Sequence, residues 1–117
     1  MSSPASSRER RRHPRVRANC AVNLVLAEGP FRANLRDISI SGMCFHLDRG
    51  IPEMTRLDLD LELPHQGEVV RIRGEGVVVR SERISAAVDH FEIAVFFHSL
   101  RDSDRERLET YCSAHAA

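Results

Sequence analysis

The sequence predicts a mainly β fold, a small six-stranded antiparallel β-barrel followed by one C-terminal α-helix. Six short segments are predicted to be strands, and the first four of them alternate apolar and polar residues, which is the period of a strand with one buried face. Turn-forming residues such as Gly29 and Pro30 separate these segments. The last segment changes to helical spacing. Six short strands in a chain of 117 residues favour a closed barrel, with a twisted sandwich as the alternative.

The first three predicted strands begin at Asn19 and run to the turn at residues 48–52. Their apolar positions are Val22, Leu24 and Leu26, then Phe31, Ala33 and Leu35, then Met43, Phe45 and Leu47. A polar segment, residues 37–42, separates the second strand from the third. We expect Ile38 and Ile40 to anchor this segment in the core, and Gly42 to adopt a backbone angle that other residues resist.

The fourth predicted strand is the clearest. Four leucines alternate with three acids: Leu57, Leu59, Leu61 and Leu63 with Asp58, Asp60 and Glu62. One face therefore belongs to the core, and the acidic stripe is interpreted as a solvated face. The fifth strand covers residues 68–80, where Gly74 and Gly76 predict a bulge. Residues 82–89 are predicted to form a loop and residues 91–97 the sixth strand.

The C-terminal segment is predicted to be a helix that packs across one end of the barrel. Ser103 and Glu106 have the spacing of a capping box. Leu108, Tyr111, Cys112 and His115 share one helical face. The predicted organisation is a disordered tail over residues 1–9 and one domain over residues 10–117. That domain comprises a flexible basic arm (10–17), the barrel (19–98) and the helix (103–115).

Charge is distributed unevenly along a chain whose net charge is zero. Residues 1–17 hold six arginines and one acid, whereas the remaining residues hold 11 arginines and 16 acids. A basic arm on an acidic body indicates an anionic partner for the arm. The basic residues are all arginine, which can grip a phosphate with two parallel hydrogen bonds.

Several classes of protein are disfavoured by what the sequence lacks. It has no apolar run long enough to span a membrane, and its first residues do not resemble a secretory signal. The three cysteines form no CxxC pair, so we expect reduced thiols in a cytoplasmic protein and no metal site. The segment from Gly74 to Gly76 lacks the third glycine of a dinucleotide fingerprint. No catalytic arrangement is apparent, so an enzyme is the least favoured class.

Two motifs carry the functional prediction. In the first, Arg11 and Arg15 lie four residues apart within an arginine-rich, non-helical arm and can approach a phosphate from different directions. In the second, an Asp37 carboxylate can accept from the N1–H and amine of guanine, and Ser39 can add a donor or acceptor. Gly42 leaves room for a ligand or for a tight turn. Alone, each motif is also typical of a solvated basic tail or of a plain polar turn. Together they suit a ligand with two phosphates and two guanines.

These residues resemble the RxxxR and D/NxSxxG signatures of the PilZ domain family, over nearly the whole chain. The resemblance implies a split barrel over which the arm folds. It also implies that Arg11 and Arg15 hold the phosphates of cyclic di-GMP, while Asp37, Ser39 and Gly42 form the second motif. Arg10 resembles a residue of members that bind a stacked ligand dimer. Ala94 replaces a glycine that is common in the family, which we expect to leave the site intact.

We therefore expect a bacterial cyclic di-GMP receptor in second-messenger signalling, with no catalytic activity and no cofactor. Ligand binding would order the arm, and the changed surface would engage a downstream effector protein. One alternative is a PilZ-fold interaction module that binds no nucleotide. Another is a nonspecific nucleic-acid binder, which the scarce aromatic residues and the acidic body disfavour.

Overall fold

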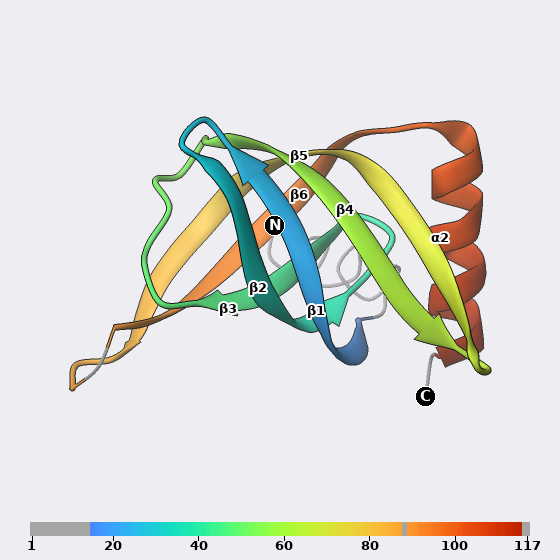
Figure 1. Ribbon diagram of the computed structural model, residues 1–117, viewed down its shortest axis with the longest axis horizontal. Coiled ribbons are helices and arrows are strands. Elements are labelled where there is room, and N and C mark those ends of the chain that lie inside the picture. The colour runs from blue at the N-terminus through green and yellow to red at the C-terminus, as the bar shows by residue number, and fades with distance from the viewer. Residues whose placement is uncertain (1–14, 88, 116–117) are drawn as a thin grey trace, which may run out of the picture.

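The computed structural model describes residues 15–87 and 89–115, and it confirms the predicted fold class. Six antiparallel strands close into a barrel in the order β1-β2-β3-β6-β5-β4, and one helix, α2, follows them (Figure 1). The elements are β1 (Val16–Leu26), β2 (Gly29–Ile38), β3 (Gly42–Leu47), β4 (Arg56–His65), β5 (Glu68–Ser85), β6 (His90–Leu100) and α2 (Asp102–His115). The predicted tail and most of the predicted arm lie outside the described residues.

The barrel interior is filled by the apolar positions of the alternating strands. Leu24, Leu61, Ile72 and Ile93 are each 0% exposed, as is Phe45 on β3. Pairing between β1 and β4, and between β4 and β5, places these apolar positions opposite one another across the sheet. Alternation alone therefore specified which face of each strand is buried.

Several strands extend beyond their predicted limits, and the extensions of β1 and β5 change the predicted organisation. β1 begins at Val16, inside the segment predicted to be arm, because Val16 pairs with Ile38 and is buried in the core. β5 continues to Ser85, so the predicted loop over residues 82–89 is wrong for its first part. Polar residues there pair with β6 although they lack an apolar alternation. The predicted bulge is confirmed by a register shift at Gly76.

α2 contributes Leu108, Tyr111 and Cys112 to the same core cluster as the barrel strands, and it stands beside β5 at one end of the molecule (Figure 1). His115, predicted to share this buried face, is exposed. No helix among the described residues is long and apolar enough to span a membrane.

The start of α2 differs from the predicted capping box. The Arg105 N–H donates to the Arg101 carbonyl at 2.9 Å, so the helix starts at Asp102 and Ser103 lies within its first turn. Asp104 fixes this end instead. Asp104 is 5% exposed, and its carboxylate accepts from the main-chain N–H of Arg73 at 3.2 Å and from Arg107 at 2.9 Å.

Candidate functional site

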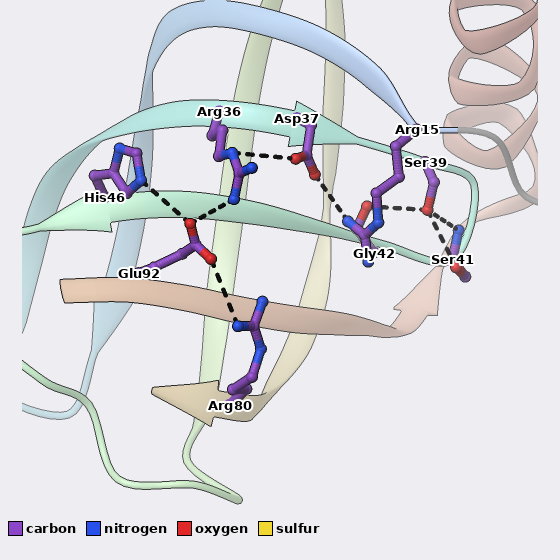
Figure 2. Close-up of polar contacts among 9 residues, drawn as sticks. All are labelled: Arg15, Arg36, Asp37, Ser39, Ser41, Gly42, His46, Arg80 and Glu92. Atoms are coloured by element: carbon purple, nitrogen blue, oxygen red, sulfur yellow. Dashed lines mark hydrogen bonds and ion pairs between the residues drawn. The ribbon is translucent and has the colours of Figure 1, made fainter. Parts of the chain in front are cut away.

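The predicted site residues that the structure describes meet where β1 begins, β2 ends and β3 begins (Figure 2). Arg17 of β1 pairs with Asp37 of β2, and Gly42 opens β3. Arg15 directly precedes β1, so its side chain reaches the same corner. Arg10 and Arg11 lie outside the described residues, and their roles stay predictions.

Asp37 is the centre of this corner. Its side chain is 13% exposed and accepts from Arg15 Nη1 at 2.8 Å, while Arg36 Nε lies 3.7 Å from its other oxygen. Neighbouring residues of a regular strand point to opposite faces, yet Arg36 and Asp37 both reach the outer surface. They do so because the pairing of β2 with β3 shifts register between Leu35 and Asp37. The carboxylate proposed to read a base is therefore held by the guanidinium proposed to hold a phosphate.

Ser39 is 2% exposed, and its hydroxyl belongs to the turn between β2 and β3. The Ser39 Oγ accepts from the Ser41 N–H at 3.3 Å and lies 3.1 Å from the Ser41 hydroxyl, and the Ser39 N–H donates to the Gly42 carbonyl at 2.8 Å. Ile38 is buried in the core and Ile40 packs against it, as expected. The segment therefore has the hydrogen bonding of a serine turn in this structure.

The special backbone angle predicted for Gly42 is wrong. Its φ is not in the left-handed region, which among the described glycines holds Gly29 and Gly67. A Cβ on Gly42 would lie 2.3 Å from the carbonyl oxygen of Val95, on the paired strand β6. Glycine is therefore required by the close approach of two main chains rather than by a special backbone angle.

Four residues of this surface carried no sequence signal. Glu92 on β6 accepts from Arg36 on β2, while His46 Nε2 of β3 and Arg80 Nη1 of β5 each lie 3.5 Å from its carboxylate (Figure 2). Arg36 and Glu92 are 56 residues apart in the chain. Only the order β2-β3-β6-β5 makes them neighbours, so no local spacing could have indicated the group.

The charges of this group stabilise one another. Burial alone would raise the pKa of Glu92, but Arg36, His46 and Arg80 outweigh burial and lower it. Glu92 and then Asp37 raise the pKa of Arg36. Burial, followed by the charges of Glu92 and Asp37, raises the pKa of Cys44, so this thiol stays protonated at neutral pH.

Between these charged groups, the surface is formed by two residues with small, uncharged side chains. Cys44 pairs with Ala94 across β3 and β6, and the two residues are 2% and 8% exposed. Arg15, Arg36 and Arg80 then supply three guanidinium groups against the carboxylates of Asp37 and Glu92. Such a surface suits a ligand that combines anionic groups, which guanidinium binds, with a flat group that donates to a carboxylate.

Comparison with known proteins identifies the family. The model of the PilZ domain matches residues 9–114, so the chain belongs to the PilZ domain family. No curated protein sequence matches the chain significantly.

Three similar solved structures contain the same fold. The inhibitor of motility MotI/DgrA of Bacillus subtilis has a TM-score of 0.75 and 22% identity over 87% of this chain and 49% of its own. The PilZ domain of Escherichia coli YcgR with c-di-GMP has a TM-score of 0.66 and 17% identity over 91% of both chains. The K. pneumonia MrkH–c-di-GMP complex has a TM-score of 0.68 and 18% identity over 88% of this chain and 50% of its own. The chain thus spans about half the length of MotI/DgrA and MrkH.

The contact between Gly42 and Val95 predicts a cost for any side chain at position 42. Gly42→Ala is expected to lower the free energy of unfolding by about 1–3 kcal/mol, because two paired main chains must move apart. Urea denaturation measures this loss. Gly50→Ala is the matched control, since its Cβ would meet only side-chain atoms, the nearest at 3.2 Å. Equal stability of both variants would show that the strands tolerate the added methyl group.

The lowered pKa of Glu92 predicts a stability that depends on pH. In the folded protein the pKa of Glu92 lies below its ordinary value of 4.5. The contribution of ionised Glu92 to the free energy of unfolding is therefore complete above pH 4.5 and is lost as the pH falls through the pKa of the folded state. Glu92→Gln should therefore unfold more easily than the wild type at neutral pH, by about 1 kcal/mol, and the difference should shrink in acid. Denaturation at several pH values measures it.

Glu82→Gln is the control, because the Glu82 side chain is 57% exposed and pairs with the same Arg80. It should change stability little at any pH. A difference between Glu92→Gln and wild type that stays constant with pH would contradict the ionic role of Glu92.

Proposed function

We propose that this chain is a receptor for cyclic di-GMP without catalytic activity of its own. The observation that carries the proposal is the presence of both PilZ motifs in a chain of that family, with Arg15 and Asp37 at one corner of the barrel. The YcgR PilZ domain and MrkH, whose folds it shares, were solved with c-di-GMP. As a second-messenger receptor it would act in the bacterial cytoplasm.

In the proposed complex, Arg11 and Arg15 bind phosphate oxygens and Asp37 accepts from the N1–H and amine of guanine. Ser39 and Gly42 border the same base, and Arg10 would contact a second, stacked ligand. Binding then requires Arg15 to exchange its partner, from the Asp37 carboxylate to a phosphate. The Arg15 side chain is 56% exposed, so its present ion pair contributes about 0–1 kcal/mol. A charge-assisted bond to phosphate contributes about 1.5–3 kcal/mol, which favours the exchange.

The proposed output is a change of surface. The arm would become ordered against the barrel when ligand binds, and the new surface would engage a downstream effector protein. The ligand is the only small molecule required, and no cofactor takes part.

A second candidate is a PilZ-fold interaction module that binds no nucleotide. One observation favours it: the Asp37 carboxylate and the Ser39 hydroxyl already have partners within the protein. Titration calorimetry with cyclic di-GMP separates the two candidates. Binding at roughly micromolar concentration or tighter supports the receptor, and the absence of heat at high ligand concentration supports the module.

The arm provides the first functional prediction. Arg11→Ala and Arg15→Ala should each weaken cyclic di-GMP binding by about 2 kcal/mol, well over tenfold, because each loses a charge-assisted bond to phosphate. Calorimetry measures the affinity, and circular dichroism checks that the β-structure is retained. Arg8→Ala is the matched control, because it removes the same charge from the tail directly before the arm and outside the motif. An equal loss of affinity in all three variants would show that the arm acts as a nonspecific basic tail.

Base recognition is tested at Asp37. Asp37→Ala should weaken binding of cyclic di-GMP even though it removes a negative charge next to an anionic ligand, because guanine loses its acceptor. The variant should also show a smaller preference for cyclic di-GMP over cyclic di-AMP, since adenine lacks the N1–H donor that Asp37 would bind. Both nucleotides are titrated against wild type and variant. Tighter binding of both by the variant would indicate an anion site that does not read the base.

A further inference from the structure

The first part of β5 has a strand neighbour on one side only. Residues 68–73 pair with β4, whereas the pairing of β5 with β6 begins at Gly74, opposite Leu100. β6 ends there and the chain turns into α2, which lies along this open side of β5 (Figure 1). Among the strands of the described chain, this stretch of β5 is therefore a sheet edge beside a helix.

Two side chains of α2 form hydrogen bonds with main-chain groups of this edge. Asp104 accepts from the N–H of Arg73 at 3.2 Å, and Arg107 Nε donates to the carbonyl of Arg71 at 3.0 Å. In an antiparallel strand, alternate residues direct both main-chain groups to the same side, so the N–H and carbonyl of Val69 point to this edge as well. Outside the strand ladder, no hydrogen bond among the described residues engages these two groups. Val69 is 61% exposed.

An open groove of about 720 Å³ lies between this edge and α2. Val69 and Tyr111 form part of its lining, and the charged lining consists of Arg71, Arg73, Arg101 and Arg107 with Asp104 and Glu106. Asp104 is buried and is already bonded to Arg73 and Arg107. Arg71 and Arg73 pair with Asp60, whose carboxylate lies 2.8 Å from Arg71 Nη2 and 3.7 Å from Arg73 Nε. Arg101 forms no ion pair among the described residues, so it is the guanidinium group that the groove leaves available next to the strand edge.

We propose that this groove is a docking site for an extended, acidic segment of a partner protein. The segment pairs its main chain with β5 at Val69, as in strand addition to a sheet edge. Its carboxylates lie against the arginines of the groove, Arg101 foremost. A second copy of this chain at this edge would bring one arginine-lined groove against another, and like charges at a sheet edge oppose self-pairing. The proposal does not depend on binding of cyclic di-GMP.

The test uses a short capped peptide that alternates glutamate and valine, and the same peptide with lysine in place of glutamate. We expect the glutamate peptide to bind about tenfold more tightly than the lysine peptide, because its charge matches the groove. Amide NMR locates the contact, and exchange of the Val69 amide hydrogen should slow when the peptide is bound. No binding of the glutamate peptide, or binding that leaves this amide unprotected, would overturn the proposal.

Two variants test the two parts of the site separately. Val69→Pro removes an N–H that does not pair with β4, and a proline is tolerated at such an edge position. Arg101→Glu reverses a charge of the groove just before α2, and Arg105→Glu is its matched control, an exposed arginine of α2 outside the groove. Val69→Pro and Arg101→Glu should each weaken peptide binding about tenfold, and Arg105→Glu should change it little.

Equal affinity of the Arg101→Glu and Arg105→Glu proteins would overturn the proposal even if Val69→Pro failed to fold. Slow exchange at Val69 without peptide, together with a concentration-dependent dimer on sedimentation, would assign the edge to a second copy instead.

Discussion

The pairing of β3 with β6 is the contact on which the candidate site depends. It joins the β2–β3 hairpin to the β5–β6 hairpin, which are distant in sequence. It also brings β6 so close to β3 that a side chain at Gly42 would collide with the main chain of Val95. The same register sets His46 beside Glu92 and Cys44 beside Ala94. A shift of one residue would turn each of these side chains to the other face of the barrel, so the charged surface exists only with this pairing.

Two carboxylates of that surface are held in different ways. Glu92 lies among Arg36, His46 and Arg80 and is shielded from solvent, so its partners are well defined by the surrounding strands. Asp37 is held mainly by Arg15, whose side chain is more than half exposed and whose main chain precedes the first strand. The Glu92 group therefore has the character of a structural support, whereas the partner of Asp37 can be exchanged at small cost.

The helix gives the molecule a second, separate polar surface. Asp104 and Arg107 join α2 to the main chain of β5 where β6 has ended, and Leu108 and Tyr111 anchor it in the core. This arrangement protects part of a sheet edge and leaves the part near the β4–β5 hairpin open. The barrel corner and the helix groove are therefore two separate polar surfaces built from different elements.

Alternating leucines and valines determined the strands, their buried faces and the fold class, because a period of two requires no knowledge of distant contacts. The motif at residues 37–42 was also visible, since its polar residues interrupt that pattern. Tertiary structure alone decided the rest. The longer β5 and the Glu92 group arise from pairing between strands far apart in sequence, and the start of α2 is set by Asp104 bonding to β5. The need for glycine at position 42 likewise comes from Val95, a residue that closure of the barrel brings within contact distance.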